Sequence, residues 1–368
     1  MQKKIIALAI AGLASTAAFA QTNVTVYGIV DMGYINAKAN NAGTSKQSFS
    51  GIQSGNQMGS RVGFRGTEDL GNGLKALFTL EYGLNADVGA GSWTGTARQS
   101  FLGLTGNFGT AVAGRLQNPG YNFASKYDVL GAAVWSPVGQ LSDNAGLSIS
   151  ARDGLGRLDN AVAYISPSFS GLTIIAAHAF GEQVKNNPIR GADTDPQAVW
   201  ALAAEYTLGD LNVGAVYHKL NDIGGTDSAQ AEHDRAEYAL GASYDFKVVK
   251  LSALYQRASD DNVGNVRSDD DSTKLWQVGV GVPVGAKGMV EVAYGRYKND
   301  RDNGRADLDA KAWGVNYEHS LSPRTVAYVG YGRLNNGSNT AFTNLNTGAL
   351  TSNGKNAAQF GLGMRHSF

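Results

Sequence analysis

The sequence predicts an all-β fold, a transmembrane antiparallel β-barrel of about sixteen strands. Two observations carry this prediction. Apolar and polar residues alternate with a period of two in segments about as long as a tilted strand needs to cross a hydrocarbon core. The connections between these segments alternate between short turns and long polar stretches. The composition of 48 Gly and 16 Tyr against 7 Pro and 5 Met suits many strands joined by tight turns.

The last segment shows the alternation most clearly. Its apolar positions, with one His, are Ala358, Phe360, Leu362, Met364, His366 and Phe368. Between them lie Gln359, Gly361, Gly363, Arg365 and Ser367. The same pattern recurs at 24–34 and 74–82. A helical interpretation fails, because a period of two would spread apolar residues around the whole helix.

The segments are joined in two ways. Short turns are predicted at 69–73, 106–109, 166–171, 208–211, 284–288 and 321–324. Longer polar stretches are predicted at 36–56, 85–96, 117–156, 182–196, 221–234, 259–272, 299–307 and 335–356. Outer-membrane barrels have short periplasmic turns at one rim and long external loops at the other. The mean hydropathy of −0.21 agrees with a polar interior and polar loops.

The start of the chain has the form of an export signal. Lys3 and Lys4 precede an apolar run at 5–13, and Ala18-Phe19-Ala20 gives the small-residue pattern that signal peptidase reads. We expect residues 1–20 to be a signal peptide that is cleaved after Ala20. Residues 21–368 would then form a single barrel domain. The formal net charge of +0 gives no sign of nucleic-acid binding.

Several arginines are expected to point into the barrel. Arg61 and Arg65 alternate with the apolar Val62 and Phe64, so they face away from lipid. An arginine on the lipid face near the midplane would cost about 2–4 kcal/mol. The same argument extends to further arginines of the alternating segments, which are Arg98, Arg115 and Arg157. Like charges in a water-filled channel would select among ions, although single arginines could instead lie at the interface or pair with loops.

The stretch at 117–156 is long for a connection and alternates only weakly. It is rich in small and aromatic residues, so it could fold into the barrel and narrow it. Its acids, Asp128 and Asp143, could then face the arginines and set up a transverse field. The alternative is an ordinary surface loop.

Four motifs resemble the general diffusion porins of Gram-negative bacteria, in particular the beta-proteobacterial type. They are Val24-Thr25-Val26-Tyr27-Gly28, the run from Ser60 to Gly71 (SRVGFRGTEDLG), the run from Arg98 to Leu104 (RQSFLGL), and Gly114-Arg115. The terminal Phe368, with alternating apolar residues before it, is similar to the family's assembly signal. His366 departs from the pattern, because an aromatic residue, often Tyr, is usual there.

This resemblance implies a homotrimer of sixteen-stranded barrels, each with its own pore. It also implies that the third external loop, here about 117–156, folds into the lumen. Arg61 and Arg98 match the basic side of the family's constriction, with Arg157 as a third member. Glu81 matches an inward acid. The loop has no Pro-Glu-Phe-Gly-Gly pattern, so Asp128 is assigned to the acidic side by position alone.

The expected function is therefore passive transport of ions and small hydrophilic solutes across the outer membrane, with a weak preference for anions. No nucleophile or cofactor motif and no metal-ligand spacing is found, so we expect no enzyme activity, cofactor or metal. Expected partners are copies of the chain and outer-membrane lipid. Acidic runs in the loops, such as Asp269-Asp270-Asp271, would reach lipopolysaccharide through divalent cations. A barrel-type hydrolase and a plugged adhesive barrel are the alternatives.

Overall fold

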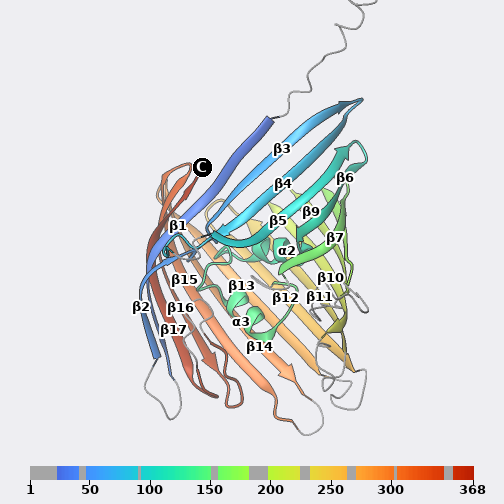
Figure 1. The fold of residues 1–368 in the computed structure, drawn as a ribbon. Coiled ribbons are helices and arrows are strands. Elements are labelled where there is room, and N and C mark those ends of the chain that lie inside the picture. The colour runs from blue at the N-terminus through green and yellow to red at the C-terminus, as the bar shows by residue number, and fades with distance from the viewer. Residues whose placement is uncertain are drawn as a thin grey trace, which may run out of the picture.

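The structure is a computed structural model that describes residues 23–40, 47–89, 93–150, 156–181, 198–223, 233–262, 271–301, 305–343 and 351–368. The expected signal peptide lies outside the described residues. The described residues form a single antiparallel sheet of 17 strands whose first and last strands pair, so the sheet closes into a barrel (Figure 1). No helix in these ranges is long and apolar enough to cross a membrane. The predicted all-β barrel is confirmed.

The first nine strands are β1 (Asn23–Ala39), β2 (Gln47–Ser54), β3 (Arg61–Gly71), β4 (Leu74–Leu84), β5 (Trp93–Gly106), β6 (Gly109–Gln117), β7 (Arg157–Ile165), β8 (Leu172–Ala179) and β9 (Ala198–Leu208). The others are β10 (Leu211–Ile223), β11 (His233–Asp245), β12 (Lys250–Asn262), β13 (Ser272–Val284), β14 (Gly288–Asp300), β15 (Leu308–Ser322), β16 (Thr325–Asn336) and β17 (Asn356–Ser367). Two helices, α2 (Pro119–Tyr127) and α3 (Pro137–Ala145), lie between β6 and β7.

The ring has sixteen positions, because β2 and β3 share one place beside β1. β2 pairs with Met32–Ala39 of β1, and β3 pairs with Asn23–Ile29. On its other side β1 pairs with β17, and Phe368 exchanges two backbone hydrogen bonds of 3.1 Å with Gly28. Closure leaves no open sheet edge to face lipid, which a spanning sheet requires.

One predicted external loop is much shorter than expected. The polar stretch at 36–56 was assigned to a loop, but β1 continues to Ala39 and Gln47–Ser54 forms β2. Serine and glycine weaken the sequence signal for a strand, whereas the ladder with β1 holds these residues extended whatever their propensity.

The two faces of the strands differ as the alternation predicts. On β13, Val278, Val280 and Val282 are exposed on the outer face, whereas Gly279 and Gly281 between them are buried on the inner face. The same parity holds at the end of the chain, where Phe360, Leu362 and Met364 are exposed. The exterior is therefore an apolar band suited to lipid.

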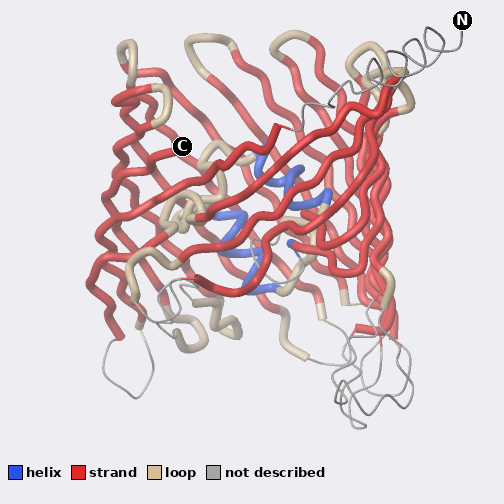
Figure 2. Tube along the Cα trace, turned by 45° about the horizontal axis from the view of Figure 1, so that its top comes forward, coloured by secondary structure: helices blue, strands red, loops and turns tan. Residues whose placement is uncertain are grey.

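The segment at 118–150 packs against the inner face of strands β8 to β16 through its two helices. In two views α2 and α3 lie within the outline of the barrel (Figures 1 and 2). The Asn118 side chain accepts a bond from the Gly120 amide, and Pro119 starts α2. Gly146 ends α3 in the left-handed conformation, with φ 64°.

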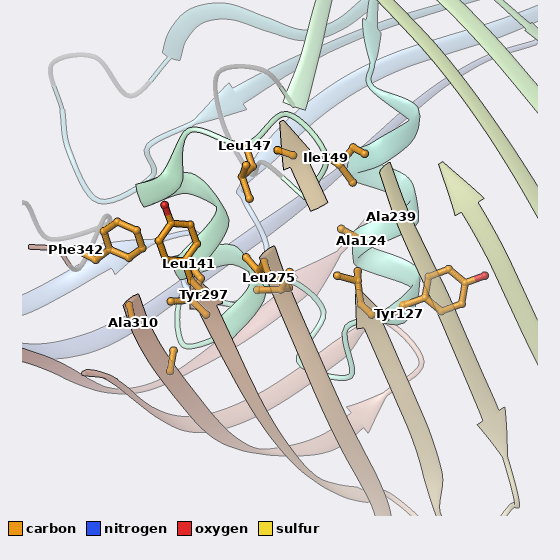
Figure 3. Packing of buried hydrophobic residues seen from close by; sticks show 14 of the residues in the cluster. Ala124, Tyr127, Leu141, Leu147, Ile149, Ala239, Leu275, Tyr297, Ala310 and Phe342 are labelled. Carbon is orange, nitrogen blue, oxygen red and sulfur yellow. The ribbon is translucent and has the colours of Figure 1, made fainter. Parts of the chain in front are cut away.

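Apolar side chains hold this segment to the wall. Figure 3 shows Tyr127, Leu141, Leu147 and Ile149 of the segment beside Leu275 and other residues of the strands. A second cluster surrounds the fully buried Trp135. Several inward positions opposite Trp135 are glycines, which lets the segment lie close to the backbone of the wall. They are Gly314, Gly330, Gly332 and Gly361.

A side chain at Gly330 is predicted to push this segment off the wall. A Cβ there would lie 2.2 Å from Cε2 of the Trp135 ring. We expect Gly330→Ala to destabilise the fold by about 1–3 kcal/mol. Urea unfolding of the refolded protein measures this.

Gly281→Ala is the matched control on the same inner face, because its Cβ would meet its first neighbour at 3.6 Å, which is ordinary contact. Equal stability of the two variants would contradict the tight packing of Trp135.

Candidate functional site

A cavity of about 630 Å³ lies between one wall of the barrel and the inward segment. Five consecutive strands, β3 to β7, each contribute one charged side chain to it. These residues are Arg61, Glu81, Arg98, Arg115 and Arg157. The remaining lining comes from uncharged residues of the same strands, from the end of β2 and the turn at 55–60, and from the segment that carries α2. Four of the five predicted arginines are therefore brought together.

Glu81 holds two of the arginines in place. Its carboxylate accepts a hydrogen bond of 2.9 Å from Nε of Arg98 and lies 3.5 Å from Nε of Arg61. The Tyr27 hydroxyl donates to the same carboxylate at 3.0 Å. We call the side of the cavity formed by β3 to β7, with Arg61, Arg98, Arg115 and Arg157, the arginine wall. Glu81 lies on this wall and orients its two basic neighbours.

A bulge turns Arg115 toward the cavity. Ala111 and Ala113 of β6 are exposed on the outer face, so regular alternation would place Arg115 outside as well. The register with β7 shifts between Gly114 and Leu116, and Gly114 has φ 140°. Such a bulge redirects the next side chain. Arg115 then bonds the Ala97 carbonyl at 2.6 Å and pairs with the exposed Asp159.

Arg157 comes from the first position of β7. Its guanidinium lies over the Tyr121 ring of α2, 4.3 Å from the ring centre. This cation–π contact joins the arginine wall to the inward segment.

Opposite the arginines, the lining residues that the described part of the segment contributes carry no charge. The segment contributes Tyr121, Asn122, Ser125, Gly131 and Ala132. The lining residues thus include four arginines and one glutamate.

Neither predicted loop acid lines this cavity. Asp128 ends α2 and is buried, where it accepts bonds from the Leu130 and Ala132 amides, the Ser136 hydroxyl and the Gln277 amide group. It therefore shapes the segment and fastens it to β13. Asp143 lies on α3, away from the lining.

Arg65 also lies apart from the cavity, over the Tyr27 ring at 4.9 Å.

The other end of α2 is fastened to β9. The Lys126 ammonium lies 2.6 Å from the Glu205 carboxylate, and the Tyr127 hydroxyl donates to the same group at 2.9 Å. Burial, with the neighbouring Glu205 carboxylate, raises the pKa of the Tyr127 phenol.

Sequence reasoning missed a second inward element, the turn at 55–60 between β2 and β3. Its anchor is Asp31, whose side chain is fully buried. One carboxylate oxygen accepts the Gln57 and Met58 amides at 2.7 and 2.6 Å. The other accepts the Tyr328 hydroxyl. An acid among the apolar residues of 24–34 was the available signal, but its partners come from β16 and the turn.

This turn touches both the arginines and the inward segment. The Gly59 carbonyl accepts a bond of 3.1 Å from Arg61. A Cβ on Gly59 would lie 3.2 Å from Nη1 of Arg98. The Asn56 carbonyl accepts the Val134 amide at 2.8 Å. Asp31 therefore positions the turn, and the turn positions Arg61 and Arg98.

Within the described ranges, no group of three or more His, Asp or Glu side chains is arranged to hold a metal ion.

A closed barrel with an arginine-lined interior is the architecture of a membrane channel. The family model for Gram-negative porins matches residues 7–339. The chain therefore belongs to the Gram-negative porins, and it is an outer-membrane porin. The predicted family and location are confirmed.

Two relatives and one solved structure that the chain resembles are porins as well. Outer membrane porin protein 32 of Delftia acidovorans is 34% identical over 348 residues, covering 91% of this chain and 90% of that protein. An outer membrane porin protein of Bordetella pertussis is 31% identical over 371 residues, covering 90% of this chain and 94% of that protein. The solved anion-selective porin from Comamonas acidovorans superposes with a TM-score of 0.79 at 29% identity, covering 95% of this chain and 100% of that one.

Replacing Asp31 tests its positioning of the turn. In Asp31→Ala the Gln57 and Met58 amides lose a charged acceptor, which is worth about 1.5–3 kcal/mol per bond. We expect altered single-channel conductance and a changed reversal potential in a salt gradient. Asp31→Asn should have a smaller effect, because its carbonyl oxygen can still accept from the turn.

Glu291→Gln is the control, since Glu291 is a wall acid of β14 that bonds Asn316 and does not line the cavity. Unchanged conductance and reversal potential in Asp31→Ala would show that the turn is held by other contacts.

Proposed function

We propose that this porin is a general diffusion pore that prefers anions, and that its narrowest part is the cavity between the arginine wall and the segment at 118–150. The observation that carries the proposal is the charge of the lining, four arginines against one glutamate. A low-dielectric wall concentrates the field of these charges in the aqueous path. Anions are then enriched there and cations are depleted.

The uncharged lining contributed by the described residues of the facing segment strengthens this preference. A transverse field between arginines and loop acids would let both kinds of ion pass along opposite sides. The lining residues from the segment have hydroxyl, amide or no polar groups. We therefore propose a clearer anion preference than the weak one expected from the sequence. A related solved porin at 29% identity is described as anion-selective, which supports the proposal.

We also propose that the pore acts by passive diffusion, without a chemical step. The arrangement that comes nearest to a hydrolase site is Ser148 with His218, whose hydroxyl and Nδ1 lie 2.9 Å apart. Both are buried, with 1% and 0% of their surface exposed, so a substrate has no access. The nearby Glu237 carboxylate accepts the Ser148 and Ile149 amides and does not orient the imidazole. This cluster fastens the inward segment to the wall.

The assembly is proposed to be a homotrimer. A solved outer membrane protein of Vibrio cholerae that shares this fold at 18% identity is described in a trimer form. We further propose that residues 1–20 are a cleaved signal peptide and that Phe368, which closes the ladder onto Gly28, belongs to an assembly signal.

The double variant Arg61→Ala with Arg98→Ala tests the origin of selectivity. Removing two of the four lining arginines should move the reversal potential in a potassium chloride gradient toward that of a cation-preferring pore. The conductance should remain measurable, because the barrel wall is unaffected.

Arg65→Ala is the matched control, since this arginine lies on β3 as Arg61 does but outside the cavity. If the double variant and the control gave the same reversal potential as the unaltered protein, the arginine wall would not set selectivity.

A further inference from the structure

The outer face of β12 to β16 carries a repeated pair of residues. On each strand a basic residue near the long-loop end is followed, two positions closer to the middle, by an aromatic residue. The pairs are Arg257 with Tyr255, Lys274 with Trp276, Arg296 with Tyr294, Lys311 with Trp313, and Arg333 with Tyr331. Residues two apart on a strand share one face, so each pair points outward together.

The exposure of these side chains confirms that the pairs point outward. Trp276 and Tyr294 are each 37% exposed, and their rings lie 5.6 Å apart. The Trp313 and Tyr331 rings lie 5.3 Å apart. Four of the basic residues, Arg257, Arg296, Lys311 and Arg333, are exposed. We call the five basic residues the basic belt and the five aromatic residues the aromatic row.

The aromatic row fixes the depth of the basic belt in the membrane. Tyr and Trp on the outside of a barrel mark the boundary between hydrocarbon and headgroups. The basic residues lie roughly 6–7 Å further along their strands toward the long-loop rim. They therefore stand at the level of the headgroups in the external leaflet.

The belt also brings like charges together. Arg257 lies directly opposite Lys274, and Arg296 lies directly opposite Lys311. Like charges in such cross-strand positions are destabilising unless an anion lies between them. An external anion would relieve this repulsion.

Among the described residues, the acids of this region pair with one member of the belt, Lys274. They gather around Lys298, which pairs with Asp300, lies 3.7 Å from Asp307, and faces Asp309 across the ladder. Asp300 also accepts from Lys274 at 3.0 Å. Within the described residues, Arg257, Arg296, Lys311 and Arg333 form no ion pair, so four outward cations remain available.

From these observations we propose that the basic belt is a docking surface for the phosphate groups of outer-leaflet glycolipid. Several phosphates of a membrane lipid would bridge the opposed cations while its acyl chains cover the aromatic row. The surface binds the lipid directly, in place of the contact through acidic loops and divalent cations that the sequence suggested. It faces away from the lumen and is independent of ion selectivity.

The test compares two triple variants of the full-length mature protein, refolded in detergent. The belt variant is Arg257→Gln, Arg296→Gln and Lys311→Gln. The control is Lys75→Gln, Lys287→Gln and Arg324→Gln, which removes three exposed charges at or near the short-turn rim. Affinity is measured by fluorescence of the tryptophans, with a bisphosphorylated lipid A as the probe.

We expect the belt variant to bind this lipid at least tenfold more weakly, while the control binds as the unaltered protein does. The same lipid without its phosphates should not distinguish the three proteins, and inorganic phosphate should give no saturable signal. Raising the ionic strength should weaken binding to the unaltered protein.

Equal affinity in the belt variant, or an equal loss in the control, would overturn the proposal. Tight binding of inorganic phosphate would overturn the assignment to a lipid. Heat-modifiable migration on gels reports whether each variant is folded. Lys311→Gln alone, with an expected loss of at least twofold, provides the test if the triple variant does not fold.

Conductance separates this proposal from the proposed function. We expect the belt variant to keep the conductance and reversal potential of the unaltered protein. A changed reversal potential would show that the belt residues act on the pore and would contradict their placement on the outer face.

Discussion

Closure of the backbone hydrogen-bond ladder is the constraint on which the rest of this structure depends. Lipid offers no partner for an unpaired amide or carbonyl, so β1 must pair with β17 as well as with β2 and β3. Closure gives every strand one face toward lipid and one toward the lumen. The outer face then takes valine, leucine and aromatic residues, and the inner face becomes the place where charge is tolerated. The arginine wall of β3 to β7 is a consequence of this division.

The inner face of the barrel differs between strands β8 to β16 and strands β3 to β7. Against β8 to β16 it is covered by the segment at 118–150, which reaches the backbone where glycines face Trp135 and is fastened by Asp128, Glu205 and Glu237. Against β3 to β7 it stays open to water and carries the arginines. Several polar groups of the segment bond to the wall, among them Lys126, Asp128 and Ser148. This explains why the acids bonded inside it or to the far wall are not available to oppose the arginines.

Much of this could be predicted from the sequence because alternation with a period of two reports directly on the two faces of a strand. The parity of Val62 and Phe64 predicts that Arg61 turns inward, and the weak alternation at 117–156 predicts a segment that could fold into the lumen. The roles of Asp31 and Asp128 could not be predicted, because their partners are distant in the chain: Tyr328 for one and Gln277 for the other. Arg115 depends on a bulge at Gly114 that shifts its parity, which a regular pattern does not reveal. The segment at 36–56 was misassigned because serine and glycine hide a strand that is held by its neighbour.

We propose that the arginine wall, which faces uncharged lining residues of the segment, makes this pore favour anions. The most direct test is the zero-current potential of the unaltered mature protein in a planar bilayer with a tenfold potassium chloride gradient. We expect stable open channels and a potential with the sign given by chloride permeating faster than potassium. A folded barrel with no conductance, or a potential with the sign of potassium preference, would contradict it.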